Sequence, residues 1–92
     1  MYNLKPTTQF KKDLKLCKKR GLNIDLLTEV LKLLEEGKSL PEQYHDHPLS
    51  GSFTGCRECH IQPDWLLIYE ISGIDLIIYL TRTGTHSDLF KL

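Results

Sequence analysis

The sequence predicts an α+β fold, with an N-terminal strand and a helical hairpin packed on a mostly antiparallel sheet that ends in a three-strand meander. Two observations predict it. Residues 7–36 repeat apolar residues at helical spacing, whereas residues 52–83 gather them into short runs separated by turn residues. The length of 92 residues is that of one domain with a small core, so we expect residues 1–92 to form one unit.

Three elements are expected in the N-terminal half. Residues 2–5 can form a strand, which a proline ends. A threonine pair can cap a helix over residues 7–20, and Asn23 can cap a second helix over residues 24–36. Because so few residues separate them, the helices form an antiparallel hairpin. The second helix carries a wide apolar band that a sheet must cover.

The C-terminal half predicts a long loop followed by strands. Residues 38–51 hold two prolines and a glycine, and an irregular loop of this length is more often functional than incidental. Ser72-Gly73 can form a two-residue hairpin turn. The segment from His86 onward is long enough for one helical turn. Three strands are expected: residues 53–61, 65–71 and 74–83.

An antiparallel meander brings the end of its first strand, the start of its second and the end of its third to one edge of the sheet. Counting outward from the expected turn pairs Ile71 with Ile74. Further along, Trp65 faces Leu80, and Arg82 lies one diagonal step from Trp65. The chemically capable side chains at that edge are His60, Asp64, Trp65, Arg82 and His86.

Imidazole, carboxylate and guanidinium groups together suit the cleavage of RNA without a metal. A histidine can act as acid or base near neutral pH, and an arginine can stabilise charge on phosphoryl oxygens. A base removes the proton of a 2′-OH, which attacks the adjacent phosphorus, and an acid protonates the departing 5′-oxygen. The products are a 2′,3′-cyclic phosphate and a 5′-OH. Trp65 and Phe90 could stack on exposed bases.

Each of these residues also has an ordinary structural interpretation. The histidines can be hydrogen-bonded residues at strand ends, and the carboxylate can be a plain turn residue after proline. The tryptophan opens an apolar run, which is typical of the core, and the arginine can be an exposed strand residue. His45 is interpreted as a loop residue. The expected convergence at one sheet edge is what favours the functional interpretation.

The formal net charge is zero, but the charges are segregated along the chain. Residues 1–20 hold seven basic residues against Asp13, a balance of +6, and residues 21–92 hold five basic against eleven acidic residues, a balance of −6. On the first expected helix the lysines face away from the apolar residues. This arc is either a solvated helix face or a surface for RNA phosphates: Lys11, Lys12, Lys15, Lys18 and Lys19.

The three cysteines, an odd number, do not indicate a disulfide framework. Cys56-Arg-Glu-Cys59-His60 does match the C-x-x-C-H string of covalent haem attachment, and its cysteines with the histidines are also candidates for zinc. In a strand, however, Cys56 and Cys59 point to opposite faces. Haem and zinc are therefore alternatives to the main hypothesis, which needs no cofactor or metal.

The chain shows no targeting signal to the membrane or the secretory pathway. No apolar run reaches the roughly 18 residues of a membrane span, and the N-terminus does not have the pattern of a signal peptide. We therefore expect a cytoplasmic protein without a membrane partner.

Three ordered segments carry a family resemblance: Asp46-His-Pro-Leu-Ser-Gly-Ser52, Arg57-Glu-Cys-His-Ile-Gln-Pro-Asp-Trp-Leu-Leu-Ile-Tyr69 and Arg82-Thr-Gly-Thr-His-Ser-Asp-Leu-Phe90. Over residues 44–90 the chain resembles the YafQ branch of the RelE/ParE toxin superfamily, and its helical half resembles that branch in length and pattern. The resemblance implies a β-α-α-β-β-β fold and a ribosome-dependent endoribonuclease that cuts mRNA in the ribosomal A site, beside ribosomal RNA. It also implies inhibition by a DinJ/RelB-type antitoxin, with operator DNA bound only through the toxin–antitoxin complex.

Transferred residue by residue, the resemblance implies a phosphate-stabilising role for Arg82, while Trp65 and Phe90 contact substrate or support the site. Which group is the acid and which the base stays open, and the preferred assignment has His86 as acid and His60, oriented by Asp64, as base. His47 enters through the resemblance alone, because its loop cannot be placed from the residues. The acid–base positions are held by His47, His60, Asp64 and His86.

A second function fits the same fold. Some members of the RelE/ParE superfamily are non-catalytic binding toxins that act on a protein target such as gyrase. The histidines discriminate between the two functions, because a protein that only binds needs no such cluster.

Overall fold

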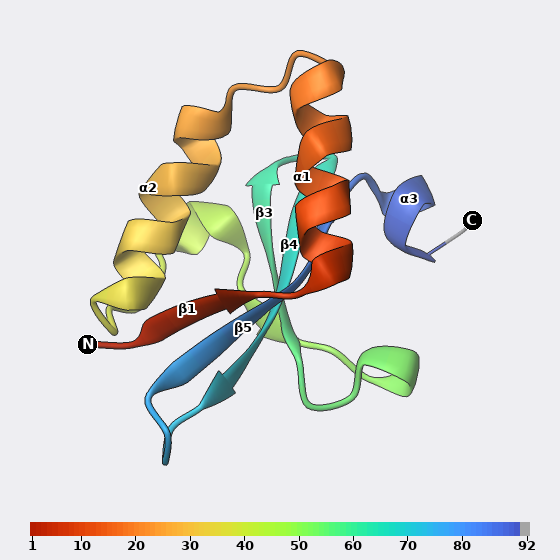
Figure 1. Ribbon diagram of the computed structural model, residues 1–92. Coiled ribbons are helices and arrows are strands. Elements are labelled where there is room, and N and C mark those ends of the chain that lie inside the picture. The colour runs from red at the N-terminus through yellow and green to blue at the C-terminus, as the bar shows by residue number, and fades with distance from the viewer. Residues whose placement is uncertain (91–92) are drawn as a thin grey trace.

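The computed structural model describes residues 1–90. Two helices cover one face of a five-stranded sheet, and a short third helix follows the last strand (Figure 1). The strands and helices, in chain order, are β1 (Asn3–Pro6), α1 (Thr8–Lys19), α2 (Ile24–Glu35), β2 (His47–Pro48), β3 (Arg57–Gln62), β4 (Trp65–Ser72), β5 (Ile77–Gly84) and α3 (His86–Phe90). Two short 3₁₀ helices flank β2: η1 (Glu42–Tyr44) and η2 (Gly51–Phe53).

The strands lie in the order β1-β5-β4-β3-β2. Strand β1 runs parallel to β5, and the other three pairings are antiparallel, so β3, β4 and β5 form a meander. This arrangement confirms the predicted fold class. The parallel pairing of β1 and β5 brings the first and last strands of the chain side by side, and α1 and α2 form the connection between β1 and the meander.

Local signals define the helical hairpin. The Thr7 hydroxyl accepts a hydrogen bond from the backbone N–H of Phe10, and the Asn23 side chain accepts one from Asp25. Gly21 follows α1 with a φ of +80°, a backbone conformation that glycine adopts without a steric penalty. Both helix starts and the turn between them therefore agree with the sequence prediction.

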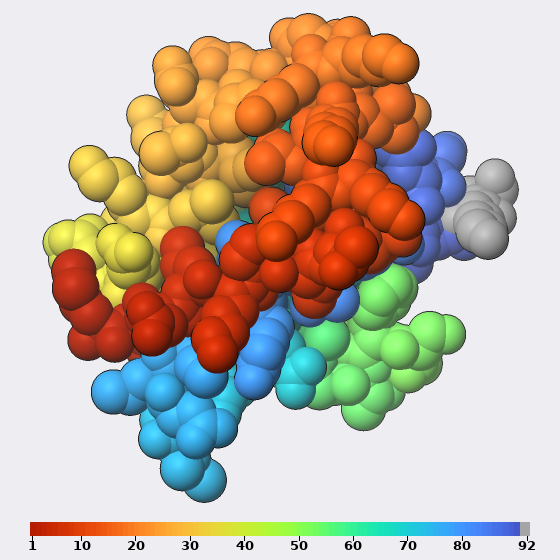
Figure 2. All heavy atoms as spheres, in the orientation of Figure 1, coloured from red at the N-terminus to blue at the C-terminus, as the bar shows by residue number. Residues whose placement is uncertain are grey.

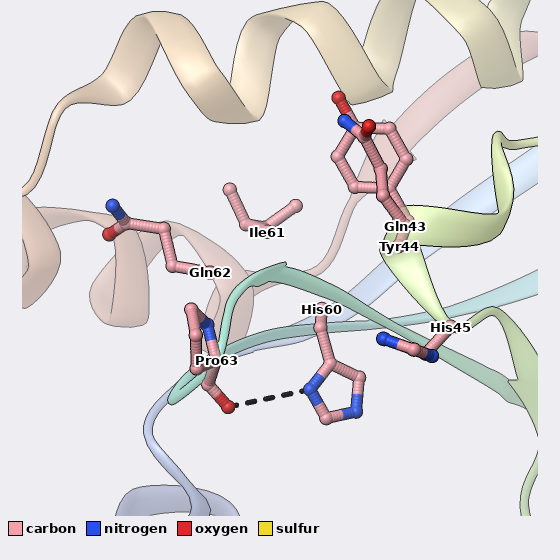
Figure 3. Close-up of a pocket in the computed structure, with 7 residues that line it drawn as sticks. All are labelled: Gln43, Tyr44, His45, His60, Ile61, Gln62 and Pro63. Carbon is pink, nitrogen blue, oxygen red and sulfur yellow. Dashed lines mark hydrogen bonds between the residues drawn. The ribbon is translucent and has the colours of Figure 1, made fainter.

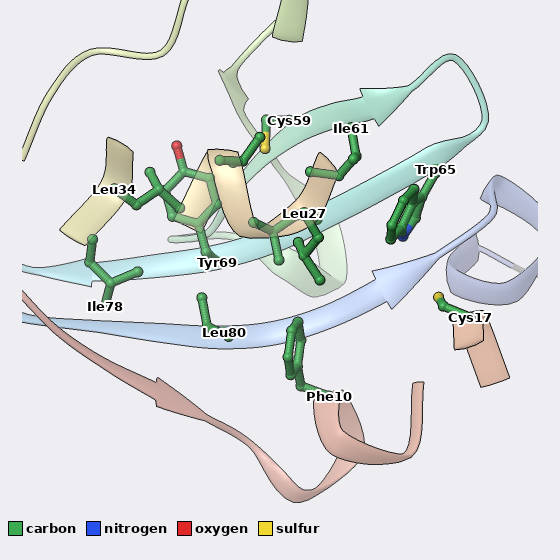
Figure 4. Close-up of a cluster of buried hydrophobic side chains, with 12 residues drawn as sticks. Phe10, Cys17, Leu27, Leu34, Cys59, Ile61, Trp65, Tyr69, Ile78 and Leu80 are labelled. Carbon is green, nitrogen blue, oxygen red and sulfur yellow. The ribbon is translucent and has the colours of Figure 1, made fainter. Parts of the chain in front are cut away.

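Alternation along β4 divides the sheet into two faces. Leu67 and Tyr69 belong to the main core with residues of α1 and α2, including Phe10 and Leu27 (Figure 4). Leu66 and Ile68 point the other way, where they form a second buried cluster with Cys56 and Leu89. The smaller cluster supports the face of the sheet that carries the candidate site.

The first strand of the meander begins later than predicted. We expected a strand from residue 53, but β3 starts at Arg57, because the chain first makes the η2 turn. The Thr54 hydroxyl and backbone N–H both bond to the Gly51 carbonyl, and Gly55 has a φ of +94°. An extended strand cannot form through such a turn.

The β4–β5 connection is also longer than predicted. Residues 73–76 form a four-residue turn, in which the Ser72 hydroxyl bonds to Asp75 and Leu76 has a φ of +55°. Ile71 consequently pairs with Ile78 instead of Ile74. The predicted two-residue turn at Ser72-Gly73 is therefore wrong. The features that define the longer connection, a side-chain hydrogen bond and a leucine with positive φ, have no clear pattern in the sequence.

A bulge in β5 changes the register once more. Tyr69 pairs with Leu80 and Ile68 with Arg82, so Thr81 is the additional residue. The predicted pairing of Trp65 with Leu80, and with it the diagonal from Trp65 to Arg82, is therefore wrong.

The segment expected as an irregular loop, residues 38–51, contains η1 and β2. Strand β2 pairs only with Arg57 and Glu58, which fixes this segment against the edge of β3. Within residues 1–90, no helix combines the length and the apolar character that crossing a bilayer requires.

Candidate active site

Four imidazoles surround the face of β3 that points away from the main core. The ring centroids of His45 and His86 each lie 5.8 Å from that of His60, and the His47 centroid lies 6.4 Å from it. The sequence predicted that His60 and His86 would meet at one edge of the sheet, and the structure brings them together. It adds His45, which was interpreted as a loop residue.

The strands determine which side chains reach this cluster. Glu58 and His60 are two residues apart on β3 and share a face, whereas Cys59 between them points into the main core. The pairing of β2 with β3 places His47 opposite Glu58. His86 enters from the other side, as the first residue of α3.

Asp46 anchors the segment that carries His45 and His47. Its carboxylate accepts a 2.6 Å hydrogen bond from the Tyr69 hydroxyl on β4. It also forms an ion pair with Nε of Arg57 on β3, at 3.2 Å. Burial and the Asp46 carboxylate raise the pKa of Tyr69, so the phenol stays protonated and donates. Asp46 is turned toward the sheet, and this fixed contact holds the segment on either side of it in place.

Glu58 connects two of the histidines. Its side chain is buried, with 5% exposure, and one carboxylate oxygen lies 3.2 Å from Nε2 of His47 and 3.3 Å from Nε2 of His60. The remaining ring nitrogens face backbone carbonyls, Nδ1 of His47 that of Pro48 and Nδ1 of His60 that of Pro63. A buried carboxylate between two imidazoles orients both rings.

Asp64 orients His86. Its carboxylate accepts a 2.6 Å hydrogen bond from Nδ1 of His86 and a 3.0 Å bond from the His86 backbone N–H. These two bonds lower the pKa of Asp64 below its ordinary value, and the bond from the backbone N–H has the larger effect. The prediction that Asp64 orients His60 is therefore wrong, because Asp64 bonds to His86 instead. His60 is oriented by Glu58 and by the Pro63 carbonyl.

Arg82 is held by Asp13 of α1. The Asp13 carboxylate accepts from Nε and Nη2 of Arg82, at 2.8 and 3.1 Å, and from the backbone N–H of Thr83. Asp13 is only 8% exposed, and its hydrogen bonds raise the pKa of Arg82. Strand β1 pairs with β5 only as far as Leu80, so the carboxylate takes the place of a strand partner beyond that point.

The register separates Arg82 from the histidines. Arg82 pairs with Ile68, which pairs with Glu58, so the three residues form one row across the sheet. Because two strand spacings separate β5 from β3, the Cα atoms of Arg82 and Glu58 lie roughly 10 Å apart. The Arg82 guanidinium is held by Asp13 at the outer edge of β5, so the structure does not bring Arg82 into the histidine cluster.

Trp65 and Phe90, which were predicted to contact substrate or support the site, are buried and half-buried respectively. The Trp65 side chain is 1% exposed, and its Nε1–H donates a 2.9 Å bond to the Thr83 hydroxyl, so it cannot stack on a base. Phe90 is half-buried and packs edge-to-face against Phe53 at 5.8 Å. Trp65 therefore supports the core, as its ordinary interpretation held, and Phe90, the last residue of α3, packs against Phe53.

The lysine arc lies on the solvent side of α1, which crosses the surface in Figure 2. All five side chains are exposed, while Phe10, Asp13 and Cys17 are the buried residues of the same helix. The arc is therefore free to meet a partner: Lys11, Lys12, Lys15, Lys18 and Lys19.

A cavity of about 440 Å³ adjoins the histidine cluster (Figure 3). His60 and His45 form the wall shared with the cluster, and η1 and the β3–β4 turn form the other walls. The histidines thus lie between an open surface and a preformed hollow.

Comparison with known proteins identifies the family. The model of the family described as "Bacterial toxin of type II toxin-antitoxin system, YafQ" matches residues 2–91. The mRNA interferase toxin YafQ of Escherichia coli K12 is 43% identical over 83 residues, which are 89% of this chain and 88% of that protein. The chain belongs to the YafQ family. The family resemblance drawn from the sequence motifs is confirmed.

Solved YafQ-family structures share the fold. The crystal structure of YafQ from E. coli BL21(DE3) matches with a TM-score of 0.90 at 38% identity, over 98% of this chain and 99% of that one. YafQ in the E. coli DinJ–YafQ complex matches with 0.87 at 40% identity, over 98% and 99%. A metal-bound toxin from Helicobacter pylori matches with 0.91 at 40% identity, over 98% and 100%.

Among residues 1–90 of this YafQ-family chain, one group of side chains could hold a metal ion. Ligand atoms of His47, Glu58 and His60 all lie within 4.8 Å of one another, and two imidazoles with a carboxylate suit a divalent transition metal. The C-x-x-C-H string forms no such group. Cys56 and Cys59 lie in the two separate clusters on opposite faces of the sheet, as the strand alternation predicted.

Glu58, Asp13 and His45 are site residues that the sequence analysis did not assign. Glu58 could have been found, because it alternates with His60 on a predicted strand and so shares its face. His45 alternates with His47 in the same way, but within a segment expected to be irregular. Asp13 gave no signal, since its role depends on where α1 passes the edge of β5.

Proposed function

We propose that this chain is an endoribonuclease that cleaves mRNA on the ribosome and so inhibits translation. Its relative in E. coli is named an mRNA interferase toxin. The observation that carries the proposal is the approach of His60 and His86 to 5.8 Å, each with its own carboxylate partner. Residues 1–92 act as one toxin domain in the cytoplasm, without a membrane partner.

The two histidines divide the proton transfers between them. Glu58 accepts the Nε2–H of His60, and the 2′-OH of bound RNA replaces the Pro63 carbonyl at Nδ1, so that the Nδ1 lone pair removes the proton of the 2′-OH. Asp64 accepts the Nδ1–H of His86 and so orients the ring with Nε2 outward, from which a proton passes to the departing 5′-oxygen. The 2′-oxygen bonds to phosphorus as the P–O5′ bond breaks, giving a 2′,3′-cyclic phosphate and a 5′-OH.

The remaining groups bind and stabilise. Asp13 uses Nε and Nη2 of Arg82, so Nη1 keeps its donors for the oxygens of the reacting phosphate. His47 shares Glu58 with His60 and keeps that carboxylate oriented. The lysine arc of α1 contacts the phosphates of mRNA and ribosomal RNA.

The chain is held inactive by an antitoxin of the DinJ/RelB type. A YafQ relative is known in complex with DinJ, which supports this partner. Operator DNA is bound only through the toxin–antitoxin complex.

The reaction proceeds without a metal. A related toxin is metal-bound, and His47, Glu58 and His60 are the residues here that would hold such an ion, where it would supply a Lewis acid. An ion there would replace the Nε2–H that His60 donates to Glu58 in the proposed acid–base mechanism, so the proposed chemistry excludes it. Toxin that has been stripped with EDTA and then freed of EDTA should therefore cleave as well as untreated toxin, and a loss of activity that zinc restores would contradict metal independence.

Primer extension on a reporter mRNA tests the function. After induction, the wild type should leave discrete 5′-OH ends, and His86→Ala and Arg82→Ala should each abolish them and relieve growth arrest while the circular dichroism spectrum is unchanged. Translating extracts with and without ribosomes test the ribosome dependence. Growth arrest with intact mRNA would instead favour a toxin that binds a protein such as gyrase.

A further inference from the structure

The cavity beside His60 is a feature that the proposed chemistry does not use. It measures about 440 Å³, within the range of small-molecule sites, and lies at the outer edge of β3 (Figure 3). Strand β2 covers that edge only at Arg57 and Glu58, so among the described residues the outer edge of β3 has no strand partner beyond Glu58. Segment η1 and the β3–β4 turn close the space instead.

The walls of the cavity contain aromatic and aliphatic side chains together with two side-chain amides. Tyr44 is half-buried and packs against the main core, and Ile61 and Pro63 complete the apolar lining. Gln43 and Gln62 are exposed, and within residues 1–90 neither amide bonds to another protein group. An amide offers a donor and an acceptor side by side, which is the pattern that a base edge presents.

The position of the cavity links it to the reaction. His60 lines the cavity and belongs to the histidine cluster, so a phosphate held at the cluster lies at the cavity mouth. The base of a nucleotide that flanks this phosphate is attached to the adjoining sugar and can enter. Single-stranded RNA is read in this way, by bases that stack on aromatic rings and hydrogen-bond through their edges.

We propose that this cavity binds one nucleobase of the RNA, that of a nucleotide flanking the scissile phosphate, with Tyr44 as the stacking surface and Gln43 and Gln62 as the groups that read the base edge. The proposal rests on the proposed function, because it places the cleaved phosphate at the histidines. Under it, Gln43 and Gln62 determine where the toxin cuts.

The cleavage-site profile of RNA tests the two amides. Gln43→Ala, Gln62→Ala and the double variant should still cut, since no catalytic group changes, but the preference for one base beside the cut should fall about tenfold in the double variant. Glu29→Ala, an exposed change on α2, serves as the control and should keep the wild-type profile. A double variant with the wild-type profile would overturn the proposal.

A matched pair of substitutions tests the stacking surface. Tyr44→Phe keeps the ring and should keep the apparent affinity for RNA, whereas Tyr44→Leu keeps the apolar bulk and should weaken it by about tenfold. Thermal unfolding of both variants identifies any loss of folding. Equal affinities of the folded Phe and Leu variants would contradict stacking on Tyr44.

An uncleavable probe separates this proposal from the nuclease assignment. Trinucleotides with a 2′-deoxy sugar at the position of attack can be titrated into ¹⁵N-labelled wild-type protein while the side-chain amide signals of Gln43 and Gln62 are followed. Saturable shifts of both signals support the base site even if no cleavage is found. No shift at millimolar trinucleotide overturns the base site, even if the wild type cleaves RNA.

Discussion

Glu58 is the residue on which the orientation of the histidine cluster depends most. One buried carboxylate lies within 3.3 Å of two imidazoles that come from neighbouring strands. A carboxylate with few waters around it acts strongly on its neighbours, because the surrounding dielectric constant is low. The proposed base therefore depends on a residue that need not touch the RNA.

Glu58→Gln keeps the shape of the side chain and removes its charge. We expect the single-turnover cleavage rate to fall by roughly 10- to 100-fold, part of the 10²–10⁴ that acid–base catalysis contributes. The matched control is Glu70→Gln on β4, whose side chain is exposed. A rate equal to that of the wild type would show that Glu58 does not orient the base.

Asp13 has a structural effect as well as a functional one. Asp13→Asn leaves Arg82 and the Thr83 N–H with weaker partners, and we expect the free energy of unfolding to fall by about 2 kcal/mol, since hydrogen bonds to charged groups are worth about 1.5–3 kcal/mol. Urea denaturation measures this loss. Asp25→Asn, at an exposed position in the first turn of α2, should cost less than about 1 kcal/mol. Equal losses in the two variants would contradict a special role for Asp13.

At the scale of elements, α3 is fixed mainly by one aspartate. Asp88 accepts a bond from the Thr85 backbone N–H, the Thr85 hydroxyl accepts one from the Asp88 N–H, and Arg20 at the end of α1 binds the same carboxylate. The hydrogen bond from Arg20 is the main reason why the pKa of Asp88 is lowered to about 2. Since α3 begins with His86, these bonds also hold the proposed acid in place.

The sign of this pKa shift predicts how acid affects α3. A carboxylate with a lowered pKa in the folded state stabilises it fully above its ordinary pKa, near 4, and loses that contribution as pH falls through about 2. The wild type should exceed Asp88→Asn in stability by on the order of 1 kcal/mol at pH 7, allowing for solvent screening. Thermal unfolding at pH 7 and pH 2 measures the difference, which should shrink to a fraction of its value at pH 7, and an undiminished gap at pH 2 would contradict the assignment.

Elements with local signals could be predicted from the sequence, and those set by distant contacts could not. Caps at Thr7 and Asn23 and the apolar spacing are local, so both helices were found where they lie. The register of β4 and β5 depends on a four-residue turn with a left-handed Leu76 and on a bulge at Thr81. Neither departure has a strong residue signature.

The candidate site shows the same division. His60, Asp64 and His86 were expected to meet because the ends of meander strands must meet, and this holds despite the wrong register. Their hydrogen-bond partners were not predictable, because the choice between His60 and His86 as partner of Asp64 depends on where α3 begins. Asp13 enters only through the path of α1 along β5.

For the whole molecule, the segregation of charge has a measurable effect. Five exposed lysines on α1 face outward, opposite the buried side of the same helix. Each lysine that contacts an RNA phosphate should contribute about 0.7 to the slope of log affinity against log salt for single-stranded RNA. The arc therefore makes binding sensitive to ionic strength in a protein of zero net charge.

Replacing lysines of the arc tests this surface. In Lys11→Ala with Lys15→Ala, the salt slope of RNA binding should decrease by about 1.4 if both residues contact phosphates. Lys32→Ala with Lys38→Ala, which removes two lysines outside the arc, should leave the slope unchanged. Fluorescence anisotropy from 50 to 300 mM salt measures both, and equal slopes would indicate that the arc is only a solvated face.

The histidine cluster is assembled from four separate parts of the chain: the end of η1, β2, β3 and the start of α3. Protein synthesis proceeds from the N-terminus, so His86 is the last of these groups to be made. A growing polypeptide that has not yet reached α3 lacks the proposed acid and cannot cut the message that encodes it. Under the proposed function, the site is therefore complete only when α3 has formed and Asp88 has bound Arg20 of the helical hairpin.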